Sequence, residues 1–221
     1  MMMSESGTYD TVPSDGRTVK SDVAVPAIIP LDTWDIVVED WNAGERVVNT
    51  EEKFGHTTNE VYYLTKKEPL TFENSALVPW KDLPASADQL ATITGTMAHV
   101  SGVGLYETEF ELPATWKSDN GALLRLGSTN GSSAQVWVNG QKANGIDLRS
   151  LTVDITSLLK TGRNTVTVVV PSTLTNRLIQ RDYGSKTLFG FFKFWSVTPA
   201  VQSYGLTGTV EIVPYTKVTV R

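Results

Sequence analysis

The feature that most constrains the fold of this chain is a succession of short segments in which apolar and polar residues alternate. Residues 106–112 read Tyr-Glu-Thr-Glu-Phe-Glu-Leu, so one face of an extended strand would carry Tyr106, Phe110 and Leu112. Comparable segments predict further strands at 34–38, 60–64, 122–126, 134–138, 151–155, 164–170, 209–213 and 216–220. No long stretch of the sequence follows the 3.6-residue helical period, so we expect very little helix.

Turn signals separate these segments. Asn139-Gly140 directly follows the segment 134–138, and Asn-Gly is a strong signal for a two-residue hairpin turn. One short helical turn is expected at 156–160, with Gly162 just past its end. Many short strands joined by turns, with little helix, predict an all-β fold built as a two-sheet antiparallel β-sandwich.

The length of 221 residues suits one domain of this kind. Residues 23–30 are apolar but contain two prolines, and they indicate an edge strand or an extended tether. Residues 66–90 contain Pro69, Pro79 and Pro84 and indicate a long connection. We therefore expect residues 1–29 to form an N-terminal extension or edge strand, and residues 30–221 to form the sandwich.

Composition excludes several kinds of site. The chain has no cysteine, which excludes disulfides, thiolate metal sites and cysteine nucleophiles. No run of apolar residues is long enough to span a membrane, and the net charge of −5 argues against a nucleic-acid partner. The opening Met-Met-Met-Ser-Glu-Ser-Gly lacks the basic and apolar regions of a signal peptide. It suggests a piece excised from a larger protein.

Charge is distributed unevenly along the chain. Residues 1–110 carry 18 acidic and 7 basic side chains, whereas residues 111–221 carry 6 acidic and 12 basic ones. Beside a solvated mixed surface, two interpretations stay open. The two halves could form faces that meet, or the basic half could provide a surface for an acidic ligand.

Motifs for enzymatic chemistry are missing from the sequence. The two histidines, His56 and His99, stand 43 residues apart and have no second histidine at metal-ligand spacing. Glu107, Glu109 and Glu111 would share one strand face with about 7 Å between neighbours, a separation that glycosidase carboxylates also show. Because a glycosidase acid must be desolvated, we interpret these three residues as the solvent-facing side of a strand. No acidic cluster has the spacing of a calcium-binding loop.

One ordered set of segments is more specific. It comprises Ser101-Gly-Val-Gly-Leu-Tyr-Glu-Thr-Glu-Phe-Glu-Leu-Pro113, Gly121-Ala-Leu-Leu-Arg-Leu-Gly127, Ala134-Gln-Val-Trp-Val-Asn-Gly140, Asp154-Ile-Thr-Ser-Leu-Leu-Lys-Thr-Gly-Arg-Asn-Thr-Val166 and Thr173-Leu-Thr-Asn-Arg-Leu178. In this order the segments closely resemble the galactose-binding-like β-sandwich, or sugar-binding domain, of glycoside hydrolase family 2. Asn176-Arg-Leu178 and Tyr204-Gly-Leu-Thr-Gly208 look closest to the accessory domain of family 106 α-L-rhamnosidase-like proteins. The resemblance covers roughly residues 30–215.

This resemblance implies a jelly-roll module without catalytic residues of its own. In the enzymes that it resembles, the hydrolytic carboxylates lie in a separate barrel domain, and a barrel needs about 200 residues or more. We therefore expect a non-catalytic carbohydrate-binding module of a secreted, plant-polysaccharide-degrading glycoside hydrolase. Its expected partners are an oligo- or polysaccharide, for example a pectic one, and the catalytic domain of the parent enzyme. The alternative is a structural accessory domain that binds no glycan. Related sandwiches commonly hold calcium, so a structural calcium is the one cofactor left open.

The long connection between segments 164–170 and 209–213 is the candidate binding region, because long ordered loops tend to be functional. A sugar site needs an aromatic ring that stacks on a pyranose, here Trp195 or Tyr183, and side chains that bind hydroxyls or a carboxylate. The candidate ligand-binding residues are Arg177, Arg181, Asp182, Tyr183, Trp195 and Tyr204. Two other interpretations of this connection stay open: a contact with a neighbouring catalytic domain, or a cover over one end of the sandwich.

Overall fold

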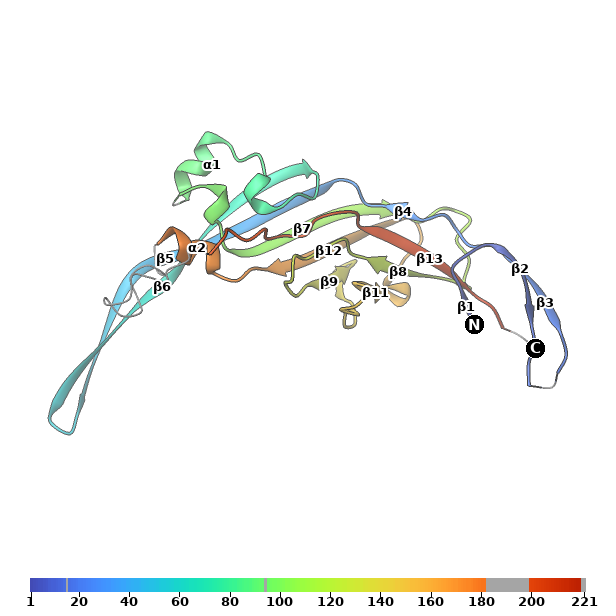
Figure 1. The fold of residues 1–221 in the computed structure, drawn as a ribbon, viewed down its shortest axis with the longest axis horizontal. Helices are drawn as coiled ribbons and strands as arrows, with labels where there is room; N and C mark the ends of the chain where they lie inside the picture. Colours follow the sequence, from blue (N-terminus) through green and yellow to red (C-terminus); the bar gives the residue numbers. More distant parts are fainter. Residues whose placement is uncertain (15, 94, 182–198, 220–221) are drawn as a thin grey trace.

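The structure is a computed structural model that describes residues 1–14, 16–93, 95–181 and 199–219 (Figure 1). The strands are β1 (Met2–Met3), β2 (Gly7–Thr11), β3 (Val19–Val23), β4 (Ile29–Pro30), β5 (Trp34–Lys53), β6 (His56–Ser75), β7 (Gly102–Glu111), β8 (Asn120–Arg125), β9 (Gln135–Val138), β10 (Gln141–Lys142), β11 (Thr152–Asp154), β12 (Arg163–Pro171) and β13 (Glu211–Lys217). The helices are the short α1 (Ala87–Thr92) and α2 (Thr175–Gln180) and the 3₁₀ turns η1 (Trp80–Asp82), η2 (Met97–His99) and η3 (Thr156–Leu158).

Two antiparallel sheets form the body of the molecule. One has the order β10-β9-β12-β7-β5-β6, and the other has the order β1-β13-β8-β11 with β4 also paired to β13. A single core of buried apolar side chains lies between the sheets and draws on both of them. The predicted two-sheet antiparallel β-sandwich is therefore confirmed.

The alternating pattern of the sequence places side chains as predicted. In β7, Tyr106 and Phe110 are buried, whereas Glu107 and Glu109 are exposed. Three valines of β12, at positions 166, 168 and 170, are fully buried in the same way. The turn Asn139-Gly140 joins β9 to β10, and both of its residues have positive φ angles, as a type I′ hairpin requires.

Two sequence predictions about strand extent are wrong. Residues 211–213 and 216–217 of the predicted segments 209–213 and 216–220 belong to one strand, β13, which runs through Pro214. Proline is tolerated there because β4 pairs with residues 211–212 and β1 with 216–217, so that no described strand pairs with position 214 on that side. Residues 66–75 belong to β6 and not to a connection. Pro69 fits because β6 is the edge strand of its sheet.

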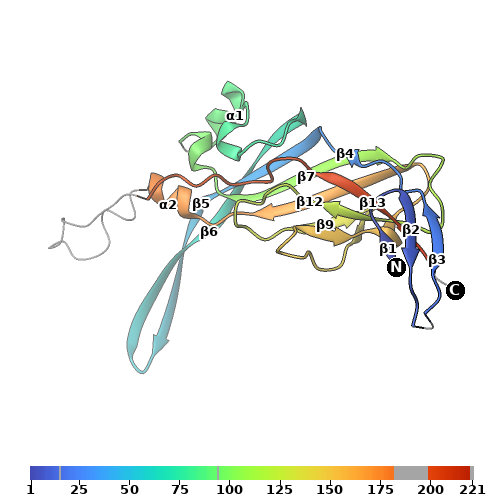
Figure 2. The ribbon, with the colours of Figure 1, turned by 45° about the vertical axis from the view of Figure 1, so that its right-hand side comes forward.

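A two-stranded arm projects from one end of the sandwich. Strand β5 pairs with β7 only from Asp35 to Asp40, but its pairing with β6 continues to the turn Phe54-Gly55. We call residues 41–67 the arm. Figures 1 and 2 show it extending away from the body. The sequence predicted only the segments 34–38 and 60–64 of this hairpin, because the residues near its tip are polar on both faces.

The opposite end of the molecule carries the hairpin formed by β2 and β3, beside both chain termini (Figure 1). Strands β1 and β4 add to the edge of the five-stranded sheet through β13. The boundary between residues 29 and 30 stays a prediction. Within the described residues, no helix combines the length and the apolar character that crossing a membrane would take.

Candidate functional site

A groove of about 510 Å³ opens where the arm leaves the sandwich, beside α2. This volume lies within the range of small-molecule sites. The arm contributes Trp41, Asn42, Tyr63 and Leu64 to its lining, and α2 with its flanks contributes Leu174, Arg177, Leu178 and Arg181. The groove thus lies between α2, at the start of the candidate binding connection, and the arm. The arm residues precede α2 by more than a hundred positions in the sequence.

A buried ion pair fixes α2 against β5. Both carboxylate oxygens of Asp40 accept from Nη2 of Arg177, at 2.5 and 2.6 Å, and the two side chains are 1% and 6% exposed. Ser101 supports both partners, since its backbone N–H donates to Asp40 and its hydroxyl accepts from the backbone N–H of Arg177. Burial raises the pKa of Asp40, and the charge of Arg177 opposes that shift. Arg177 therefore anchors the helix, and its charge is matched by Asp40.

Arg181 follows α2 directly, four residues after Arg177, and its side chain reaches the arm. Its Nη2 donates to Oδ1 of Asn42 at 2.5 Å, and the same oxygen accepts from the backbone N–H of Ala43 at 2.9 Å. In the part of the chain that the structure describes, no carboxylate forms an ion pair with Arg181. An exposed guanidinium is thus held in place by a neutral amide.

The two aromatic rings of the groove differ in accessibility. Nζ of Lys67 lies 4.6 Å from the centre of the Trp41 ring, and the indole N–H donates to Glu39 at 2.9 Å. Trp41 is therefore packed as a wall. Tyr63 is 57% exposed, and the adjacent Leu64 is 49% exposed, so these two side chains provide the open apolar surface of the groove.

The predicted ligand-binding residues fall into three groups. Arg177 and Arg181 line the groove. Tyr204 is buried in the core, where its ring packs edge-on against Trp80 with centroids 5.9 Å apart and its hydroxyl bonds to that of Thr173 at 2.6 Å. The other three predicted residues, Asp182, Tyr183 and Trp195, lie outside the described residues.

Sequence reasoning did not identify the arm residues of the groove. Tyr63 and Leu64 fell within the predicted strand 60–64, and no role in binding was predicted for them. A signal was present in the run Val61-Tyr-Tyr-Leu64, because successive apolar residues on a strand place apolar side chains on both faces. One of those faces had to be exposed or covered by another element.

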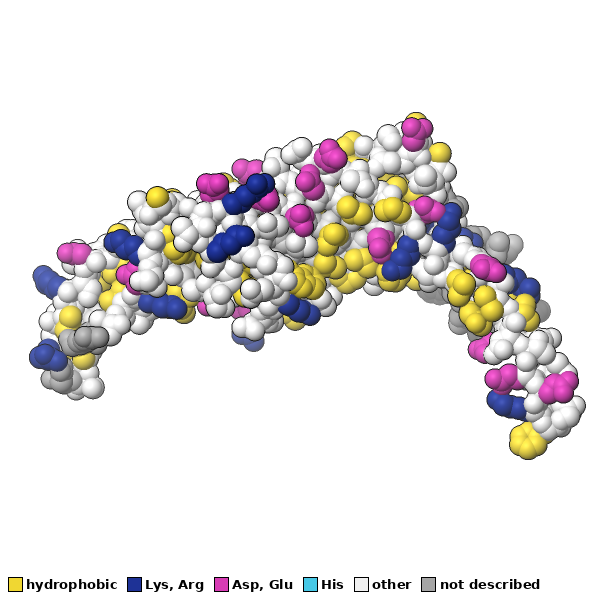
Figure 3. Space-filling view, turned by 180° about the vertical axis from the view of Figure 1, so that it is seen from behind, with side chains coloured by type: hydrophobic (Ala, Val, Ile, Leu, Met, Phe, Trp, Pro, Cys, Tyr) yellow, Lys and Arg dark blue, Asp and Glu magenta, His cyan; other side chains and the backbone are white. Residues whose placement is uncertain are grey.

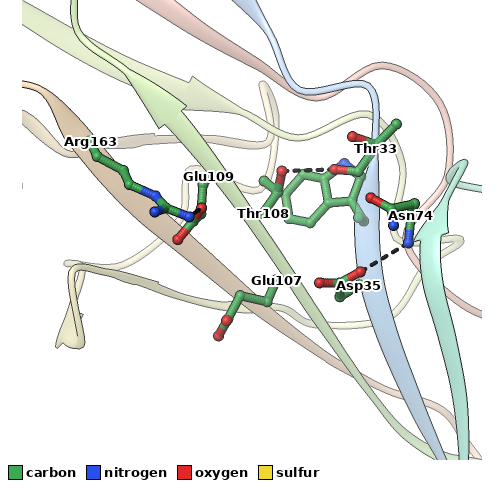
Figure 4. Close-up of a pocket in the computed structure, with 8 residues that line it drawn as sticks. Thr33, Asp35, Asn74, Glu107, Thr108, Glu109 and Arg163 are labelled. Carbon is green, nitrogen blue, oxygen red and sulfur yellow. Dashed lines mark hydrogen bonds and ion pairs between the residues drawn. The ribbon is translucent and has the colours of Figure 1, made fainter.

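A second, polar recess of about 380 Å³ lies on the outer face of the six-stranded sheet (Figure 4). Asp35 and Glu107 face each other across β5 and β7, and Glu109 forms an ion pair with Arg163. All of these side chains are exposed, as expected for Glu107 and Glu109. A glycosidase acid sits in an apolar environment, which this recess does not provide. Among the described residues, no three His, Asp or Glu side chains are grouped as metal ligands.

Known proteins contain domains that are similar to this one. Residues 79–176 match the family model of the beta-galactosidase second all-beta domain. The structure is similar to that of a rhamnosidase from Novosphingobium sp. PP1Y, with 20% identity and a TM-score of 0.55, over 91% of this chain and 16% of the rhamnosidase. A beta-glucuronidase from Bifidobacterium dentium is similar over 89% of this chain and 31% of its own, with 17% identity and a TM-score of 0.45.

No curated protein sequence matches the chain. The chain spans about one sixth of the rhamnosidase that it resembles. The family match and the shared sandwich fold confirm the resemblance to all-beta domains of glycoside hydrolases that the sequence motifs indicated. Residues 79–176 are therefore similar to the second all-beta domain of beta-galactosidase.

Proposed function

We propose that this chain is a non-catalytic module of a glycoside hydrolase and that it binds carbohydrate in the groove between the arm and α2. The observation that carries the proposal is the pairing of an open aromatic and apolar surface, Tyr63 and Leu64, with the fixed hydrogen-bond donors of Arg181. A pyranose has an apolar face that packs on an aromatic ring and a rim of hydroxyls that accept hydrogen bonds. The groove offers both kinds of contact side by side.

The parent enzyme is proposed to be rhamnosidase-like, secreted and active on plant polysaccharides. The similarity to the rhamnosidase structure, which extends over 91% of this chain, supports that assignment together with the motif Asn176-Arg-Leu178. In the structure Asn176 holds the connection after α2, since its amide exchanges two hydrogen bonds with the backbone of Gln202 at 2.8 and 2.9 Å. Within this motif Asn176 therefore holds the backbone beside the groove, whereas Arg177 and Leu178 line it.

Affinity electrophoresis of the isolated chain tests the proposal. Gels containing pectic polymers, plant gums or galactans should retard the chain in at least one case, and none of these polymers should release reducing sugar. The variant Tyr63→Ala should lose the retardation. Tyr62→Ala is the matched control, because this tyrosine is the next residue of the same strand, is similarly exposed and does not line the groove. Equal effects of both variants would contradict the proposed site.

A second candidate function is a structural one, in which the chain packs against the catalytic domain and binds no glycan. The arm favours it, because Val48, Val61, Tyr62 and the tip residue Phe54 are 45–101% exposed. Figure 3 shows hydrophobic side chains along the arm, at the lower right. Free migration of the chain through every glycan gel would favour this role over carbohydrate binding.

A further inference from the structure

We infer that the sugar bound in this groove carries a carboxylate and that Arg181 is the residue that selects it. This inference rests on the proposed function, because it names the class of ligand for the same site. It starts from the charges around the groove, where Arg181 forms no ion pair among the described residues and is held by a neutral amide.

Three charged side chains near the groove have acidic partners, whereas Arg46, which lies opposite Tyr63 on the arm, forms no ion pair among the described residues. Arg177 is paired with Asp40 inside the protein. On the arm, Lys67 lies 3.5 Å from Glu39, and Lys66 lies 2.6 Å from Glu68. Arg181 differs from the three paired side chains, because its partner Asn42 is neutral. Among the described residues, no carboxylate therefore neutralises the charge of Arg181, which favours an anionic ligand over a neutral one.

The orientation of Arg181 suits a carboxylate in particular. Guanidinium has five N–H donors in a planar fork, and a carboxylate can accept two of them in parallel. The hydrogen bond to Asn42 uses a single nitrogen, Nη2, and holds the group against the arm. Fixing the guanidinium in advance reduces the ordering cost when a ligand binds.

The exposed aromatic ring of Tyr63 indicates that the anionic group of the ligand belongs to a sugar. A lone anion would gain nothing from an aromatic ring that is 57% exposed, whereas a pyranose can cover it. A uronic acid combines an apolar ring face with a carboxylate on the same residue. The volume of the groove, about 510 Å³, leaves room for such a unit within a chain.

The test compares polyuronates with the same polymers after reduction of their carboxyl groups. Calorimetry of the full chain with polygalacturonan and with glucuronan, each beside its carboxyl-reduced form, isolates the contribution of the carboxylate. We expect at least one polyuronate to bind about ten- to a hundred-fold more tightly than its reduced form, the range for hydrogen bonds to a charged group. This preference should decrease as salt increases.

Arg181→Gln should remove the preference for the polyuronate, while binding of the reduced polymer should change less, because the glutamine amide still donates hydrogen bonds to hydroxyls but carries no charge. Arg149→Gln is the matched control, because it removes the same charge from an exposed position outside the groove and should leave the preference intact. A preference that survives Arg181→Gln would overturn the inference, and so would equally tight binding of dextran sulfate. Binding of neutral glycans alone would overturn it while the proposed function stands. Binding of no glycan at all would overturn both.

Discussion

Removing the carboxylate of Asp40 should destabilise the protein more than any change to a surface ion pair. The substitution Asp40→Ala would leave Arg177, 6% exposed, without its carboxylate, and the backbone N–H of Ser101 without its acceptor. Breaking a buried pair by deleting one partner costs about 3–5 kcal/mol. For a chain of this length each kcal/mol corresponds to about 2–4 °C, so the melting temperature should decrease by about 6–20 °C.

Urea and thermal unfolding followed by circular dichroism measure this loss. The control is Glu109→Ala, which breaks the pair with Arg163 where the side chains are 43% and 69% exposed, and it should cost less than about 1 kcal/mol. The double variant Asp40→Leu with Arg177→Met should recover most of the stability, because no buried charge remains. If Asp40→Ala costs no more than the surface control, the account of this pair as a desolvated anchor is refuted.

Three further predictions concern the core and its hydrogen bonds. Tyr106→Phe should cost about 2–4 kcal/mol in urea unfolding, because the Tyr106 hydroxyl accepts from two buried N–H groups that would lose their acceptor, whereas Tyr9→Phe at the surface should cost less than about 0.5 kcal/mol. Although burial raises the pKa of Asp154, hydrogen bonds from neighbouring hydroxyl and N–H groups hold it below its usual 3.8. Asp154→Asn should therefore lower stability at neutral pH, and the difference from the native chain should close as the pH falls below 3.8; a constant difference would contradict this linkage. Gly102→Ala should cost about 1–3 kcal/mol, because the new Cβ would lie 2.1 Å from a carbonyl oxygen of β5, whereas Gly145→Ala, with open space around it, should be close to neutral.

The parts of the fold that the sequence predicts are those where one face of a strand is buried. Tyr106, Phe110 and the valines of β12 alternate with polar residues because the sandwich interior imposes that period. Where neither face of a strand is buried, apolar and polar residues do not alternate. The distal parts of β5 and β6 therefore could not be predicted from the sequence. The short helix α2 was missed for a different reason, since its six residues are too few to show a helical period.

From the sequence, only the α2 side of the candidate site could be predicted, and the arm side could not. Arg177 and Arg181 stood out as charged residues in a long connection, but their different roles depend on Asp40 and Asn42, which lie 137 and 139 positions away in the sequence. Spacing within the connection cannot distinguish a buried arginine from an exposed one when the partner comes from a distant strand. Tyr204 illustrates the same limit, because its aromatic character suits a core as well as a sugar site.

The arm has a consequence for how the molecule can change. From Val48 to Lys67 its side chains are exposed, and an isolated two-stranded ribbon has little stability of its own. Local opening of this segment should therefore occur far more often than global unfolding, so its amides should exchange with solvent long before those of β7 and β12. A substitution near Phe54 should leave the free energy of the sandwich untouched. The residues at the tip of the arm can thus be substituted, so that the arm recognises a different partner, without a loss of stability in the sandwich.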